Sequence, residues 1–96
     1  MDKKQILEII KNNQVVLTSK FGLERIGLFG SYAREEQYEN SDVDLAVEIS
    51  KADLFNFIAL KNYLQDILKK NVDIVRYRDT MNESLKRRIL RDIIYV

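Results

Sequence analysis

Apolar residues near the start of the chain recur at the spacing of one face of a helix. The stripe lies within residues 3–20 and consists of Ile6, Ile9, Ile10, Val16 and Leu17. Positions three and four apart share one side of a helix, so the pattern predicts a helix over residues 3–20 with this stripe in the core. Gly22 is a suitable residue to end it, because glycine readily adopts the left-handed conformation after a helix.

Two further apolar runs flank a polar loop and predict strands over residues 24–29 and 43–49. The second run alternates, so one face is expected to carry Val43, Leu45, Val47 and Ile49, and the other Asp44, Ala46 and Glu48. A short helical turn can begin at Ser31, and the polar residues 35–41 predict a surface loop.

The second half of the chain predicts a helix, a strand and a last helix. Ser50 and Asp53 resemble a capping box before a helix that runs to about Lys70 and ends at Asn71. The candidate core residues of this helix are Leu54, Phe57, Ile58, Leu64 and Leu68. Residues 72–76 predict a third strand. Thr80 or Asn82 would cap the last helix, whose expected buried residues are Leu85, Ile89, Leu90 and Ile93.

This order of elements predicts one α/β (α+β) domain over residues 1–96, with a small three-stranded mixed sheet and flanking helices. The expected order is helix, strand, turn, strand, helix, strand, helix. Because a helix connects the second and third strands, they should be parallel neighbours with a right-handed crossover.

The composition narrows the chemistry that is available. The chain has no cysteine and no histidine, which excludes disulfides, thiolate nucleophiles, Ser-His triads and histidine metal ligands. The net charge of +1 argues against direct nucleic-acid binding. No apolar run approaches the roughly 20 residues that span a bilayer, and residues 1–6 lack the features of a signal peptide. We therefore expect a cytoplasmic protein that does not contact the membrane.

Gly30-Ser31, separated by ten residues from Asp42-Val43-Asp44, is the strongest candidate site. A Gly-Ser pair at a strand exit can present backbone N–H groups and a hydroxyl to a phosphate. Aspartates two residues apart at the start of a strand lie on one face and can hold hard cations. The two features together predict a site for a nucleoside triphosphate with Mg²⁺.

Asp73 extends this candidate site. A register that pairs Val72 and Ile74 with Val43 and Leu45 places Asp73 on the same face as Asp44. Three converging carboxylates repel one another unless a cation compensates. In a two-metal arrangement, Asp73 would bind the second ion or accept the proton of the attacking hydroxyl.

Alone, each of these features has an ordinary structural explanation, as a turn, a solvated strand start or a polar strand edge; their conjunction favours function. Arg34 could contact a phosphate or pair with a loop carboxylate such as Glu36. The basic residues Lys86, Arg87, Arg88 and Arg91 could contact a partner or the triphosphate, or simply be solvated positions around the last helix.

The run Gly30-Ser31-Tyr32-Ala33-Arg34, followed by Ser41-Asp42-Val43-Asp44-Leu45, closely resembles the Gly-Ser-x10-Asp-x-Asp signature of the DNA polymerase β nucleotidyltransferase superfamily. The short length, Val72-Asp73-Ile74-Val75 and the ending Leu85-Lys86-Arg87-Arg88-Ile89-Leu90 resemble its minimal nucleotidyltransferase (MNT) branch, so the likeness covers residues 20–96.

Many members of that branch are antitoxins encoded beside a HEPN-domain toxin, similar to adenylyltransferases that move AMP from ATP to a tyrosine of the toxin. The resemblance implies that Gly30 and Ser31 bind phosphate, and that Asp42, Asp44 and Asp73 hold Mg²⁺, with ATP as substrate. The family usually has Gly after the Ala-Arg pair, where this chain has Glu35.

The expected function is therefore AMP transfer from MgATP to a hydroxyl of a HEPN-type toxin. One alternative is a non-catalytic antitoxin that acts by binding its toxin. Another is a nucleotidyltransferase of the antibiotic-modifying kind, against which the length of 96 residues argues, because no second domain encloses a small acceptor.

Overall fold

A mixed four-stranded sheet organises the fold, which the computed structural model describes for residues 1–96. The strands are β1 (Leu23–Phe29), β2 (Val43–Ile49), β3 (Val72–Arg76) and β4 (Ile94–Tyr95), in the sheet order β3-β2-β1-β4. β2 and β3 are parallel, as the helical crossover predicts, whereas β1 is antiparallel to both of its neighbours. The predicted class and the mixed sheet are confirmed.

β4 corrects the predicted number of strands from three to four. Its two residues pair with Gly27 and Leu28 of β1. The guanidinium carbon of Arg25 also lies 3.6 Å from the centroid of the Tyr95 ring. Two residues are too few to show a strand periodicity, so β4 exists because of contacts that the rest of the fold supplies.

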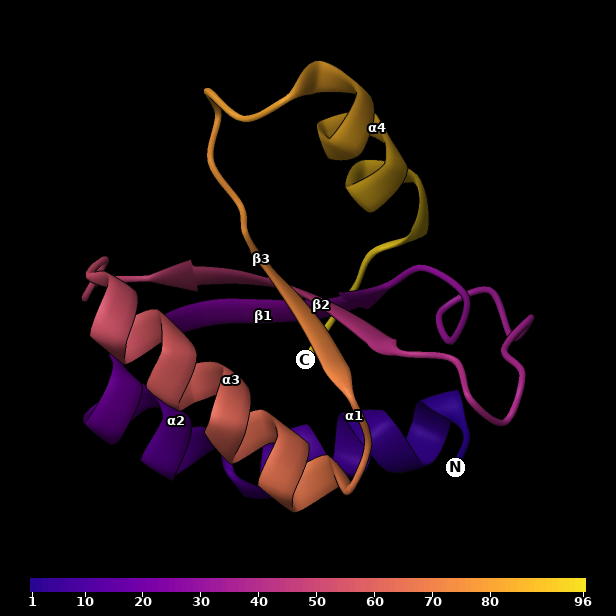
Figure 1. The fold of residues 1–96 in the computed structure, drawn as a ribbon, viewed down its shortest axis with the longest axis horizontal. Helices are drawn as coiled ribbons and strands as arrows, with labels where there is room; N and C mark the ends of the chain where they lie inside the picture. The colour runs from indigo at the N-terminus through magenta and orange to yellow at the C-terminus, as the bar shows by residue number, and fades with distance from the viewer.

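The helices lie on both faces of the sheet (Figure 1). α1 (Lys3–Asn12), α2 (Gln14–Phe21) and α3 (Leu54–Leu68) cover one face, and α4 (Glu83–Asp92) lies on the other. None of the four is long and apolar enough to cross a membrane.

The helix predicted over residues 3–20 is two helices, which meet at Asn13. The side-chain amide of Asn13 donates to the carbonyl of Ile9 at 2.8 Å. Such local bonds from a side chain compete with a regular helix. The bend leaves Val16 39% exposed, so its predicted core position is wrong. Gly22 ends α2 in the left-handed conformation with φ 70°, as expected.

α3 begins and ends differently from the prediction. Asp53 caps it by accepting from the Asn56 N–H at 2.9 Å, whereas the Ser50 hydroxyl donates to the Gly22 carbonyl, so the predicted capping box is wrong. Lys69, rather than Asn71, ends the helix, in a left-handed conformation. The helix therefore buries Leu60, Leu64 and Leu68, while the predicted core residues Leu54 and Ile58 are exposed.

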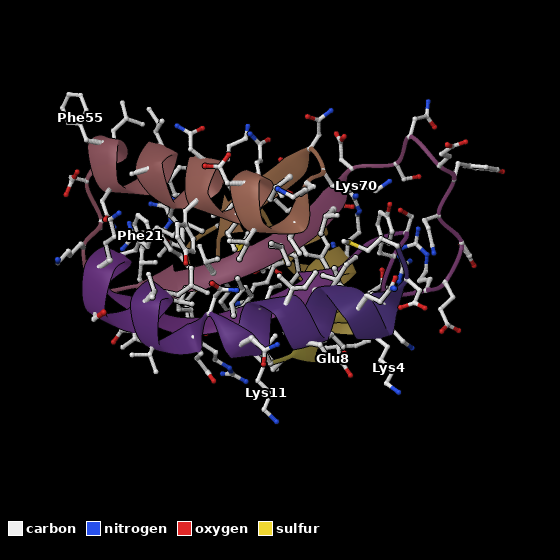
Figure 2. All side chains as sticks on the ribbon, turned by 90° about the horizontal axis from the view of Figure 1, so that it is seen from below. Lys4, Glu8, Lys11, Phe21, Phe55 and Lys70 are labelled. Carbon is white, nitrogen blue, oxygen red and sulfur yellow. The ribbon has the colours of Figure 1, made fainter.

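Each face of the sheet has its own apolar cluster. The alternation predicted for β2 is confirmed on the face that α1, α2 and α3 cover, where Val43, Leu45, Val47 and Ile49 are buried. In Figure 2, Phe21 lies between α2 and α3, with its ring 5.3 Å from that of Tyr63, while Phe55 points outward.

On the opposite face, Ile89 of α4 forms a smaller cluster with Phe29 and Ala46 of the sheet. Asn82 caps α4, one of the two predicted alternatives. Leu90 is 52% exposed and does not belong to the core, which corrects another prediction.

Candidate active site

β1 ends in a sharp turn that begins at Gly30. This glycine has φ 77°, and a Cβ at its position would overlap the Asp44 carboxylate. Only glycine allows this conformation and this close approach without strain. The turn then closes through bonds from the Arg34 N–H to the Gly30 carbonyl (3.1 Å) and from the Glu36 N–H to the Ser31 carbonyl (2.9 Å). Ser31, which is partly exposed, follows this glycine in the turn.

Glu35 has φ 59°, a left-handed conformation that favours glycine. This is the position at which the resembling family usually has Gly, so the turn keeps that shape despite the larger residue. The Glu35 side chain is largely exposed and lies 3.5 Å from the Lys3 ammonium.

Asp44 and Asp73 are opposite one another on the parallel strands β2 and β3. Their neighbours pair as Val43 with Val72 and Leu45 with Ile74, so the predicted register is confirmed. Because side chains alternate along a strand, both aspartates lie on the face that α4 partly covers. Asp42 is exposed and immediately precedes β2.

The environment of Asp44 favours its protonated form. Partial burial, followed by repulsion from Asp73 and Asp42, raises the pKa of this carboxyl from its ordinary value of 3.8 to about 6. Arg88 of α4 and Arg34 of the turn act in the opposite direction. Asp73, Asp42, Arg88 and Arg34 are therefore the charged groups that influence the Asp44 carboxyl.

The donor set suits a hard cation, because it consists of carboxylate oxygens with a hydroxyl nearby. The structure nevertheless contains no group of three or more acidic side chains arranged to hold a metal ion, so the expected three-carboxylate centre is not preassembled. Asp44 and Asp73 are the adjacent pair, and Asp42 would complete the set.

Arg34 pairs with the loop carboxylate of Glu36, which was one of its two predicted roles. It also pairs with a carboxylate that was not predicted. It bonds to Glu36 at 3.1 Å and to Asp92, the last residue of α4, at 2.6 Å. Sequence reasoning missed Asp92, because it lies 58 residues from Arg34 and no local pattern links them. Arg91 also binds Asp92, and Lys86 pairs with Asp79 at 3.7 Å.

A polar cleft opens beside Asp42, between the loop before β2 and the connection from α3 to β3. These segments line it with residues that include Ser41, Lys69 and Asn71. No apolar side chain lines this cleft, and of the three aspartates only Asp42 lies at it.

A turn that begins at Gly30 lies against Asp44, which pairs with Asp73 on a parallel strand; this is the arrangement that the resemblance to nucleotidyltransferases implies. Residues 4–96 match the family model described as polymerase beta, nucleotidyltransferase, and the chain belongs to that family.

Among curated proteins, the chain is similar to the protein adenylyltransferase MntA of Thermococcus cleftensis, with 35% identity over 94 residues that cover 97% of this chain and 94% of the relative. Among solved structures, a candidate minimal nucleotidyltransferase superposes with a TM-score of 0.78 at 34% identity, covering 98% of this chain and 95% of that one.

Two assemblies share the fold as well. A toxin-antitoxin structure with AMP-PNP matches with a TM-score of 0.69 at 26% identity, covering 99% of this chain and 72% of that one. A complex of a tri-AMPylated HEPN toxin of Shewanella oneidensis with an MNT antitoxin matches with a TM-score of 0.65, covering 93% and 70% of the two chains; at 24% identity it shows the fold alone.

Proposed function

We propose that the protein is an antitoxin that transfers AMP from MgATP to a tyrosine hydroxyl of a HEPN-type toxin. The observation that carries the proposal is the pairing of Asp44 with Asp73. The Asp44 carboxylate lies directly against Gly30, where the turn that would bind phosphate begins. The adenylyltransferase relative and the toxin-antitoxin structure with AMP-PNP support the choice of adenosine triphosphate and of a toxin as partner.

Each site residue has a defined task in this reaction. Gly30 lets the backbone approach the phosphates, and the Ser31 hydroxyl donates a hydrogen bond to them. Asp42 and Asp44 would hold Mg²⁺, and Asp73 would hold a second ion or accept the proton of the acceptor hydroxyl. A bound Mg²⁺ would supply positive charge against the triphosphate. The acceptor hydroxyl would attack the α-phosphorus, and the bond from this phosphorus to pyrophosphate would break.

The exposed position of Asp42 suits an acceptor that is part of another protein. The polar cleft beside Asp42 has no lid of its own, so the surface of a partner would exclude water and position the hydroxyl. This function requires a cytoplasmic location, because ATP and the proposed toxin partner are found in the cytoplasm.

Intact-mass analysis of the cognate toxin after incubation with this protein and MgATP tests the proposal. We expect one or more added AMP units. Asp44→Asn should lower the rate at least tenfold, a loss of about 1.4 kcal/mol in transition-state stabilisation. Glu48→Gln is a matched control, because Glu48 lies on the same face of β2 but away from the turn.

An unmodified toxin that the Asp42→Asn/Asp44→Asn double variant still neutralises in cells would contradict AMP transfer. That outcome would favour inhibition by binding alone.

A further inference from the structure

Asp92 is an unusual carboxylate. It is the last residue of α4, and its side chain is only 6% exposed. A negative charge is unfavourable at a helix C-terminus, and a charge withdrawn from water needs close partners. Helix formation therefore gives no reason for an aspartate at this position.

Two guanidinium groups compensate the charge of Asp92. Arg91 donates to both of its oxygens, at 2.9 and 3.0 Å, and Arg34 donates through Nη1 at 2.6 Å. The bonds from Arg91, and to a smaller extent the bond from Arg34, lower the pKa of the Asp92 carboxyl, so it remains ionised near neutral pH. Arg91 lies on the same helix, whereas Arg34 belongs to the turn that begins at Gly30, and only the second bond connects α4 to the site.

The bond from Asp92 also fixes which part of Arg34 stays available. Nη1 is held by Asp92, and Nε is held by Glu36, whose side chain is 67% exposed. The structure assigns no bond to Nη2. A guanidinium whose Nε and Nη1 are both held by carboxylates can present the N–H groups of Nη2 to a phosphate with little loss of side-chain entropy.

We propose that Asp92 is a positioning residue that holds the Arg34 side chain at the turn that begins at Gly30, so that Nη2 of Arg34 meets the phosphates of the nucleotide. The inference rests on the proposed function, because it requires ATP to bind at this turn. It assigns to α4 a task in nucleotide binding that the local sequence of the helix does not indicate.

Calorimetric titration of ATP with Mg²⁺ into four proteins tests the proposal: the wild type, Asp92→Asn, Arg34→Gln and the double variant. We expect Asp92→Asn to weaken ATP binding about tenfold, and Arg34→Gln to weaken it at least as much. The double variant should bind no more weakly than Arg34→Gln, because Asp92 acts through Arg34. Arg91→Gln removes the other partner of Asp92 and should keep wild-type affinity.

The outcomes separate the two hypotheses. Wild-type protein that does not bind ATP would overturn the proposed function, and this inference with it. Wild-type binding that Asp92→Asn leaves unchanged, or tightens, would overturn the inference alone. If Asp92→Asn lowered the affinity for ATP equally in the wild type and in the Arg34→Gln variant, Asp92 would have only a structural role. Asp92→Glu keeps the charge and should restore part of the affinity if Asp92→Asn folds poorly.

Discussion

At the scale of single residues, Asp44 shows most directly how the site and the stability of the fold conflict. β2 holds this carboxyl partly buried against Gly30 and next to Asp73. Its pKa is raised to about 6, chiefly by burial. The charged form that a metal ligand needs is therefore the form that the folded protein disfavours when no cation is bound.

Replacing Asp44 by Asn should stabilise the fold at neutral pH while it impairs the proposed reaction. A raised pKa means that the folded state binds the proton more tightly than the unfolded state, so stability falls as pH rises from 3.8 to about 6 and stays low above it. We expect Asp44→Asn to add on the order of 1 kcal/mol at pH 7 after allowance for solvent screening, and much less at pH 4.

Thermal unfolding followed by circular dichroism at both pH values measures this effect. Asp66→Asn, at an exposed position of α3, is the control and should show no such dependence. A stabilisation of equal size at pH 4 and pH 7 would contradict the explanation.

At the scale of elements, two turns adopt left-handed conformations with side chains that do not favour them. Glu35 has φ 59° in the turn after β1, and Lys69 has φ 55° at the end of α3. The second turn determines where the chain leaves the helix and enters β3, and therefore the register that brings Asp73 opposite Asp44.

Lys69→Gly should raise the free energy of unfolding by about 0.5–1 kcal/mol. Glycine removes the steric cost of the left-handed conformation, which exceeds the extra entropy that it gives the unfolded chain. Chemical denaturation provides the measurement. Lys61→Gly, the same substitution inside α3, should instead lower the free energy of unfolding by a similar amount. Destabilisation by both variants would contradict this account of the helix end.

At the scale of the whole molecule, the two faces of the sheet have different roles. The larger apolar cluster lies under α1, α2 and α3, while the acidic residues lie on the face of α4, over a smaller cluster. Substitutions at the carboxylates therefore leave the main core untouched, and the acidic face can carry electrostatic repulsion that a cation would relieve.

Binding of ATP should depend on a divalent cation. A triphosphate adds negative charge beside Asp42, Asp44 and Asp73, so without a cation its binding is opposed by all three. Calorimetric titration should give an affinity for ATP at least tenfold higher with Mg²⁺ or Mn²⁺ than in EDTA, a difference of about 1.4 kcal/mol. Equal affinity in EDTA would show that these carboxylates do not bind a metal.

Local patterns were sufficient to predict much of the fold. The bounds of β2 and β3, residues 43–49 and 72–76, agree with the structure because alternation and apolar runs depend only on the chain itself. That Asp44 and Asp73 share a face also follows from the sequence, since a shift of one residue would put the apolar side chains of the two strands on opposite faces.

The same reasoning was wrong where neighbours distant in sequence decide exposure. Leu54, Ile58 and Leu90 have helical spacing, but the direction in which each helix packs leaves them exposed. β4 forms because β1 offers a free edge, and Asn13 divides the first helix so that both parts fit the sheet.

The sequence by itself determined the fold class, three of the four strands and the shared face of Asp44 and Asp73, because these follow from periodicity and the alternation of side chains. Only the tertiary structure decided the surroundings of Asp44, the fourth strand and the bond from Arg34 to Asp92. These depend on how helices and turns pack across the sheet, and packing brings together residues that no local pattern in the chain connects.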